Sequence, residues 1–231
     1  MSRLKVIMII ASLFFGLFQK NNVTAQDWPN LGKYQEANAA LKTADSQEQR
    51  VVFMGNSITE GWLQANPSFF EGKPYVNRGI GGQTTPQMVL RFRQDVIDLN
   101  PKVVVILAGT NDIAENTGPI TLEQIRDNML SMVQLAKGNG IVPIVSSVLP
   151  AYDYPWRPGK QPNIKIPRLN TMLRQMCMEQ EVPYLDYFSA MTDDRNGLPA
   201  QYTTDEVHLT KEGYAVMEKL VEKAIEDAMN K

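Results

Sequence analysis

The stretch "KVVVILAG", residues 102–109, is apolar throughout after its first residue and ends on glycine. A strand that alternates apolar and polar residues buries one face only. A continuous run of β-branched residues is instead typical of a parallel strand that helices cover on both faces. This stretch therefore predicts an open α/β sheet, and we expect further strands of the same kind in the flanking sequence.

Four more segments are predicted strands: "RVVFMG" (50–55), "YVNRG" (75–79), "IVPIVSSVL" (141–149) and "VPYLDYF" (182–188). Helical patterns lie between them. One helix is expected at Thr84-Thr85-Pro86, since proline suits a first turn, and another at the capping box "TLEQ" (121–124). Two more are expected over 163–180 and from Thr210 to the C-terminus. The alternation predicts a three-layer α/β/α sandwich around a five-stranded parallel sheet.

Composition narrows the possible functions. The chain has 231 residues and a net charge of −2, without a basic stripe, so nucleic acid is not an expected partner. A single histidine and a single cysteine, Cys177, argue against a zinc site and rule out an intramolecular disulfide. We expect Cys177 to be buried, and we predict that the protein needs no metal or cofactor.

The N-terminus has the pattern of a secretory signal peptide. Arg3 and Lys5 precede an apolar run from Val6 to Phe18, and small residues suited to cleavage end at Ala25. The alternative is a membrane anchor, but a helix of this run covers only about 20 Å of a hydrocarbon core of roughly 30 Å. We therefore predict a signal peptide over 1–25, one domain over 26–231, and a periplasmic or extracellular bacterial protein without a stable membrane anchor. No cysteine follows the run, so a lipid anchor is not indicated.

Ligands of open α/β sheets bind beyond the carboxyl ends of the strands, so the segments after each strand are the candidates for a site. Ser57 follows the first strand, the glycine-rich "NRGIGGQTT" (77–85) includes the end of the second, and Asn111 follows the third. Asp205 and His208 follow the fifth, and their spacing lets one turn of backbone bring the carboxylate to the imidazole.

Each of these features alone is more often structural. A serine after a strand usually caps a helix, and a lone histidine usually has no catalytic role. Together they supply a nucleophile, a base, a group that orients the base, and donors for an oxyanion. These are the parts that acyl transfer through a serine needs. The α/β-hydrolase elbow G-x-S-x-G is absent, because Thr59 stands at its last glycine.

These blocks, in this order, resemble the four diagnostic blocks of the SGNH (GDSL-type) hydrolase superfamily, from about Val51 to Tyr214. The pattern is most similar to the catalytic subunits of the intracellular platelet-activating-factor acetylhydrolase and related bacterial acetyl esterases. The resemblance implies a flavodoxin-like fold and a Ser57–His208–Asp205 triad. It also implies an oxyanion hole made by the N–H of Ser57, the N–H of Gly82 and the side-chain amide of Asn111.

Two positions depart from the family pattern. Asn56 stands where the first block usually has aspartate, and Glu206 stands where the last block usually has glycine. The aspartate is not a triad member, so the first change leaves the predicted activity intact. The second is expected to alter the local turn or charge.

Aromatic residues near the predicted site are candidates for substrate contact. In "PAYDYPWRPGKQP" (150–162), Tyr152, Tyr154 and Trp156 would form a platform for a sugar ring, and Trp62 would wall the acyl pocket. Equally, the prolines stiffen a connection and the aromatics cover the sheet. The signal peptide, the small domain and the acetylhydrolase-like blocks together favour removal of a short acyl group, acetyl above all, from carbohydrate.

Two other functions stay open. The first is a lipid-directed lysophospholipase or thioesterase. The second is a non-catalytic glycan-binding domain, although such a domain would be expected to have lost part of the set Ser57, Asn111, Asp205 and His208. The segment 27–49 is expected to form a helix packed on the sheet or a dimer contact, and the oligomeric state is left open.

Overall fold

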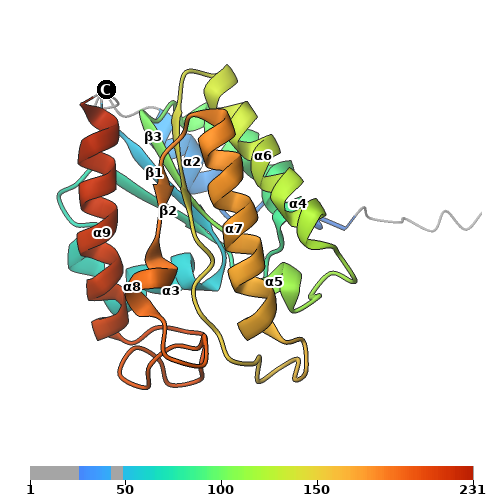
Figure 1. Ribbon diagram of the computed structural model, residues 1–231. Coiled ribbons are helices and arrows are strands. Elements are labelled where there is room, and N and C mark those ends of the chain that lie inside the picture. The colour runs from blue at the N-terminus through green and yellow to red at the C-terminus, as the bar shows by residue number, and fades with distance from the viewer. Residues whose placement is uncertain (1–25, 43–48, 231) are drawn as a thin grey trace, which may run out of the picture.

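The computed structural model describes residues 26–42 and 49–230 and has three layers (Figure 1). The central sheet comprises β1 (Val51–Gly55), β2 (Tyr75–Gly79), β3 (Val103–Leu107), β4 (Val142–Ser146) and β5 (Tyr184–Leu185). Its order is β2-β1-β3-β4-β5 and every pair is parallel. The predicted α/β/α sandwich with a five-stranded parallel sheet is thus confirmed. The predicted signal peptide, 1–25, lies outside the described residues.

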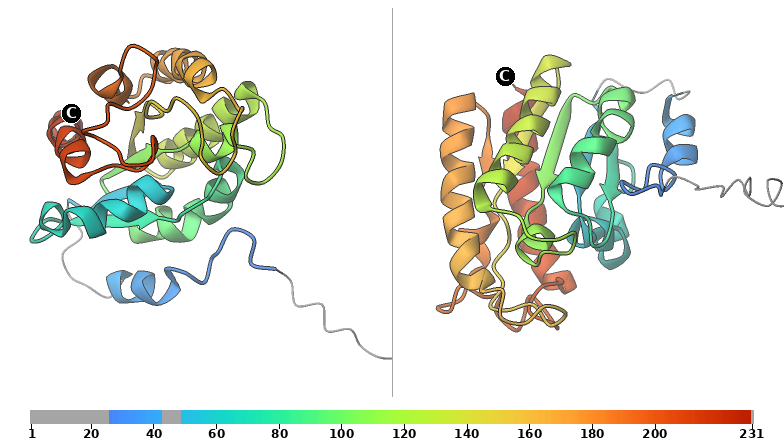
Figure 2. Two further views of the ribbon diagram at one scale, coloured as in Figure 1. Left: turned by 90° about the horizontal axis from the view of Figure 1, so that it is seen from below. Right: turned by 90° about the vertical axis from the view of Figure 1, so that its right-hand side faces the viewer.

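Helices cover both faces of the sheet. On one face lie α4 (Thr85–Asp95), α6 (Leu122–Gly138) and α7 (Pro162–Gln180), and on the other α3 (Ser57–Ala65), α8 (Tyr187–Met191) and α9 (Lys211–Met229). Short elements complete the chain: η1 (Pro67–Phe69), η2 (Ile97–Leu99) and α5 (Thr110–Ile113). Helix α2 (Gln35–Lys42) lies outside the three layers, at the β2 end of the sheet (Figure 2).

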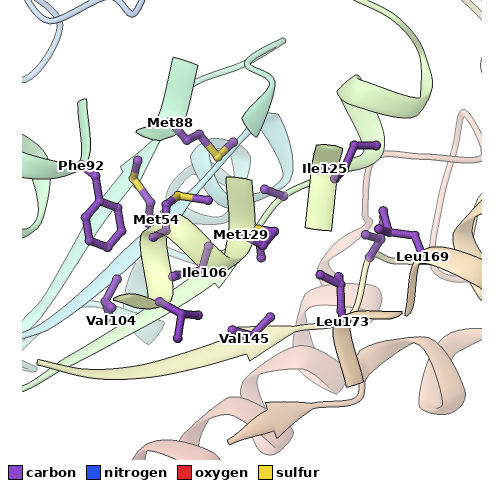
Figure 3. Close-up of a cluster of buried hydrophobic side chains, with 14 of the residues drawn as sticks. Met54, Met88, Phe92, Val104, Ile106, Ile125, Met129, Val145, Leu169 and Leu173 are labelled. Atoms are coloured by element: carbon purple, nitrogen blue, oxygen red, sulfur yellow. The ribbon is translucent and has the colours of Figure 1, made fainter. Parts of the chain in front are cut away.

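The two-sided core explains why β3 is apolar throughout. Val104 and Ile106 point to one face, where they meet Met88 and Met129 from the covering helices (Figure 3). Val103, Val105 and Leu107 join the cluster on the opposite face, and all five β3 side chains are buried. Because both faces lose water contact, neither can carry a polar residue without a partner.

Helix starts follow the predicted signals. Thr84 is the N-cap of α4, with Pro86 in the first turn, and a capping box is present there. Thr121 caps α6, where its hydroxyl accepts from the N–H of Gln124 at 3.2 Å. The free thiol of Cys177 is buried in α7, as expected, and burial raises its pKa to about 12. In the part of the chain described, none of the helices has the length and apolarity needed to span a membrane.

Several predicted elements are shorter than expected, among them the strand predicted over 141–149, which covers only Val142–Ser146. The fifth strand covers only Tyr184–Leu185, because the Asp186 carboxylate accepts from the N–H of Ser189 at 3.0 Å and starts α8 at Tyr187. In the segment 27–49, the described part is helical only over α2. Asp27 accepts from the N–H groups of Leu31 and Gly32, at 2.8 and 2.9 Å, and so holds the preceding residues in turns.

Candidate active site

Ser57 is the first residue of α3, directly after the turn that ends β1. Asn56 is buried and caps this helix, with its side-chain oxygen accepting from the N–H of Ile58 at 3.0 Å. Aspartate and asparagine cap helices equally well. The asparagine at this position therefore performs the same local task as the aspartate that is usual in the first block.

Ser57, His208 and Asp205 lie in one hydrogen-bonded row. Ser57 Oγ is 3.0 Å from His208 Nε2, and His208 Nδ1 is 2.6 Å from Asp205 Oδ2. The other carboxylate oxygen of Asp205 accepts from the N–H groups of Val207, at 3.0 Å, and His208, at 2.7 Å. The carboxylate is thus held by the same turn that carries the imidazole.

The charge on Asp205 is favoured by its surroundings. Partial burial acts to raise its pKa, but hydrogen bonds from the His208 ring, the His208 N–H and the Val207 N–H outweigh burial, so that the pKa lies below its usual value. At neutral pH an ionised carboxylate facing Nδ1 keeps the proton of His208 on that nitrogen. Nε2 is then free to accept the Ser57 hydroxyl proton.

Glu206 occupies a backbone conformation that suits glycine. Its φ is +68°, in the left-handed region. A side chain there costs about 1 kcal/mol relative to glycine. The departure from the family pattern therefore places a small local strain in the turn between Asp205 and His208.

Gly82, a predicted oxyanion donor, lies in the turn 80–83 that follows β2. The Gln83 N–H donates to the carbonyl of Ile80 at 3.3 Å, and Gly82 at the third position of this turn has φ +75°. Glycine is favoured at the third position of this turn, because it adopts a positive φ without strain. The N–H of Gly81 donates to Glu60 Oε2 at 2.7 Å, which ties the turn to α3.

Asn111 reaches the same turn from α5. Its amide nitrogen donates to the Gln83 carbonyl at 3.0 Å, and its amide oxygen accepts from Asn116 at 3.1 Å. Asn116 also donates to the Gly82 carbonyl at 3.2 Å. These bonds fix the orientation of the Asn111 amide and leave one of its two N–H hydrogens for a ligand.

The structure thus brings Ser57, Gly82, Asn111, Asp205 and His208 to one edge of the sheet. The four aromatic candidates separate into two groups. Trp156 is 40% exposed, with its ring centre 6.3 Å from that of His208. Tyr152 is exposed as well, but its ring lies under the guanidinium of Arg195 at 4.8 Å.

Substrate contact by Trp62 and Tyr154 was a wrong prediction. Trp62 is 2% exposed, stacks on Phe69 and Tyr214, and donates its indole N–H to Glu218 at 3.0 Å. Tyr154 is fully buried, with its hydroxyl 2.9 Å from that of Thr110. Both rings fill the interior, where a substrate at Ser57 does not reach them.

Two residues at this edge were missed. Glu60 lies one turn after Ser57, a spacing that places it on the same helix face and offered a signal. Asn116 follows Asn111 by five positions, with no spacing rule that predicts the contact. Its role depends on how the loop after α5 folds back.

The chain matches a known protein family and is similar to solved structures of two Bacteroides proteins. Residues 53–216 match the model of the GDSL-like Lipase/Acylhydrolase family. A Bacteroides fragilis protein assigned as an acylhydrolase is 48% identical, with a TM-score of 0.85, over 87% of this chain and 98% of its own. A GDSL-like lipase from Bacteroides thetaiotaomicron is 46% identical, with a TM-score of 0.82, over the same shares, 87% and 98%.

Two further relatives are more distant. An acetyl-xylooligosaccharide esterase from Geobacillus, solved as a single-residue variant, has 20% identity and a TM-score of 0.60 over 78% of this chain and 95% of its own, a likeness of fold alone. The uncharacterized lipoprotein YqeF of Bacillus subtilis is 38% identical over 78 residues. That match spans 32% of each protein, so the chain covers about a third of the length of this curated relative.

Proposed function

The chain belongs to the GDSL-like lipase/acylhydrolase family and is thereby an ester hydrolase, and we propose that it is an exported serine esterase that removes short acyl groups, acetyl above all, from carbohydrate. The observation that carries the proposal is the row Ser57–His208–Asp205, with distances of 3.0 and 2.6 Å.

In the proposed mechanism Ser57 Oγ attacks the ester carbonyl while His208 Nε2 takes its proton. The N–H groups of Ser57 and Gly82 and the free amide hydrogen of Asn111 stabilise the oxyanion. His208 then protonates the leaving alcohol, which leaves an acyl-enzyme on Ser57. Water attacks this ester with His208 again as base, and the acid and the serine are released. Asp205 orients the imidazole throughout.

The surroundings of the site support a polar alcohol moiety. The side chains of His208 and Asp205 remain 45% and 40% exposed, so a large alcohol has room beside them. The neighbouring groups are the Glu60 carboxylate and the Asn116 amide. The Geobacillus relative acts on acetylated xylo-oligosaccharides, which supports a sugar ester on this fold.

A lipid ester is the second candidate, because one observation favours it. A cavity of about 620 Å³ lies between α2 and α3, and its lining includes Leu41, Leu63 and Phe70 together with Glu60. Such apolar walls suit an acyl chain. We rank this candidate second because Ser57 is not among the residues that line this cavity, and because the ion pair of Glu60 with Lys33 places charge in its wall.

Export is proposed from the pattern of residues 1–25, in which a charged start, an apolar run and small residues follow one another. The Bacillus subtilis relative is a lipoprotein, which is a class of exported protein, and this supports export. We place the mature protein in the periplasm or outside the cell.

The test is hydrolysis of 4-nitrophenyl esters from acetate to octanoate by the mature protein. We expect the highest rate on acetate and a loss on the order of 10⁴-fold in Ser57→Ala and in His208→Ala. Ser131→Ala, which changes a half-buried serine on α6, serves as the control and is expected to keep its activity. Full activity in Ser57→Ala would overturn the nucleophile, and a rate that peaks on octanoate would favour the lipid candidate.

A further inference from the structure

We propose that a cavity between the N-terminal segment (residues 26–34) and the turn at residues 80–83, called here the oxyanion turn, is the subsite for the sugar chain of the substrate, with Trp28 and Trp156 as its two stacking walls. The inference rests on the proposed esterase function and specifies its substrate as an O-acetylated oligosaccharide. The cavity measures about 570 Å³, and its lining includes Trp28, Gly81, Gly82, Asn116, Trp156 and Arg157.

The cavity adjoins the reacting groups on two sides. A Cβ added at Gly81 would lie 3.7 Å from Ser57 Cβ, so this wall residue borders the nucleophile. On another side the Trp156 ring lies 6.3 Å from the His208 ring. A ligand filling the cavity would therefore place its near end at Ser57, where the ester must be.

The chemistry of the walls fits a pyranose chain. Trp28 and Trp156 are each 40% exposed, and indole rings offer large apolar faces for the C–H face of a sugar. Around them stand amide and guanidinium donors for hydroxyl groups. Among the residues that the structure describes, the guanidinium of Arg157 forms no ion pair and is available to a ligand. A few placed polar groups on aromatic walls are the usual make-up of a ligand site.

The Trp156 ring is held in place before any ligand arrives. Trp156 stacks on the buried Tyr154 ring at 5.1 Å and donates its indole N–H to Asn116 at 3.0 Å. Because Asn116 also orients Asn111, the sugar platform and the proposed oxyanion donor share one support. Such rigidity lowers the entropic cost of binding.

The N-terminal segment around Trp28 is fastened by three glutamines. Gln83 donates to the carbonyl of Pro29 at 2.7 Å, Gln87 to that of Trp28 at 2.8 Å and Gln94 to that of Leu31 at 2.6 Å. Gln83 belongs to the oxyanion turn itself, and the other two belong to α4. The segment is therefore a fixed wall of the site, bonded along its length.

A second cavity extends the path beyond Trp28. It measures about 360 Å³, shares Trp28 and Thr117 with the first, and continues past Pro86 and Gly118 to Asn128. An elongated ligand could run from Ser57 across Trp28 into this second hollow. The structure thus favours an oligosaccharide over a single acetylated sugar.

The test compares chain lengths. We measure kcat/KM of wild type, Trp28→Ala and Leu31→Ala on acetylated mono-, di- and tetrasaccharides of xylose, glucose and galacturonic acid. Each value is divided by kcat/KM of the same variant on 4-nitrophenyl acetate. We expect this ratio to rise with length in wild type for at least one sugar, and to fall about tenfold for its tetrasaccharide in Trp28→Ala. Leu31 is an exposed neighbour in the same segment, and its alanine variant is expected to keep the ratio.

A binding measurement separates the two proposals. In the Ser57→Ala background, calorimetry with the preferred tetrasaccharide should give a Kd about tenfold weaker when Trp28→Ala is added. A ratio that does not rise with length for any sugar, or that Trp28→Ala leaves unchanged, would overturn the subsite while serine-dependent hydrolysis of 4-nitrophenyl acetate stands. Loss of that serine dependence would instead overturn the proposed function.

Discussion

At the scale of single residues, Asn111 has one free amide hydrogen at the oxyanion turn. We expect Asn111→Ala to lower kcat by roughly 10²- to 10³-fold, about 3–4 kcal/mol, because one donor to the oxyanion is lost. Steady-state kinetics on 4-nitrophenyl acetate measures this. Asn139→Ala, which removes an exposed amide at the end of α6, is the control. A loss confined to KM would contradict the role.

Asp112, next to Asn111, makes a pH-dependent contribution to stability. Burial raises its pKa to about 6, although the hydroxyl and N–H of Thr85 donate to it and act in the opposite direction. The folded chain thus keeps the proton at pH values where the unfolded chain, with its ordinary pKa, has lost it. As pH rises from about 4 to 6, Asp112 therefore costs stability, on the order of 1–3 kcal/mol in total.

The measurement is urea unfolding of wild type and Asp112→Asn at pH 4.0, 5.5 and 7.0. We expect the free energy of unfolding of wild type minus that of the variant to fall as pH rises, since asparagine does not titrate. A difference that grows with pH would show that the folded state favours the ionised carboxylate.

Individual site residues were predictable to different degrees. Ser57, Asn111, Asp205 and His208 could be named because each follows a predicted strand and the order of the blocks is informative. Trp28 and Asn116 could not, since their neighbours come from distant parts of the chain. Aromatic rings near a site pack in a core as readily as they bind a ligand, which is why Trp62 was misassigned.

At the scale of elements, the start of α3 depends on a close approach to β2. A Cβ at Gly79 would lie 2.1 Å from the backbone nitrogen of Glu60, so the helix that carries Ser57 could not stay in place. We expect Gly79→Ala to lower kcat/KM by about 10²-fold, because displacement of a catalytic group by about 1 Å has such effects. Kinetics with circular dichroism would measure it.

Gly138→Ala is the matched control for that variant. A Cβ at Gly138, the last residue of α6, would meet nothing within 4 Å. Alanine favours helix over glycine by up to about 1 kcal/mol, so this variant should be as active as wild type and as stable or slightly more so. Equal losses in both variants would show that close packing at Gly79 has no special role.

Helix starts were predicted well and strand ends less so. Capping boxes are local, since the cap and its partner are three residues apart, and the sequence alone shows them. The end of β5 was misjudged because "VPYLDYF" is β-rich by composition. The hydrogen bond from Ser189 to Asp186 outweighs that propensity and turns the chain into α8.

At the scale of the whole molecule, the buried Arg91 joins three parts of the fold. It donates to Gln83 of the oxyanion turn at 2.5 Å, to Asp95 of α4 at 3.0 Å and to the carbonyl of Gly55 at the end of β1 at 2.9 Å. Each of these bonds comes from a different nitrogen of the guanidinium, Nε, Nη1 and Nη2, whereas lysine would have to make all three from a single nitrogen. We expect Arg91→Lys to lose about 1–3 kcal/mol of unfolding free energy, the cost of leaving a buried acceptor unpaired.

Urea unfolding measures that loss, with Arg93→Lys as control, because Arg93 is exposed on the same helix. A loss of similar size in the control would mean that the charge pattern of α4, and not the buried network, sets the stability.

The layered fold could be predicted almost completely, because an apolar run such as 102–109 is typical of a parallel strand that helices cover on both faces. The place of α2 could not. Its one buried residue, Asn38, is polar and bonds to Asp95 and to Arg78. Its apolar face, Ala37, Ala40 and Leu41, is short and lines a cavity next to α3, so the sequence pattern did not show where the helix lies.

The two outer strands of the sheet have a consequence for association with other chains. An edge strand with unpaired backbone groups invites a strand from another molecule. On β2, the outward carbonyls of Asn77 and Gly79 accept from the side chains of Arg78 and Tyr34, and the N–H of Gly79 donates to the Asn77 side chain at 2.9 Å. The other edge, β5, is two residues long. The β2 edge is bonded by the molecule's own side chains, and the β5 edge is too short to pair with a strand of another molecule. The sheet is therefore protected against edge-to-edge aggregation.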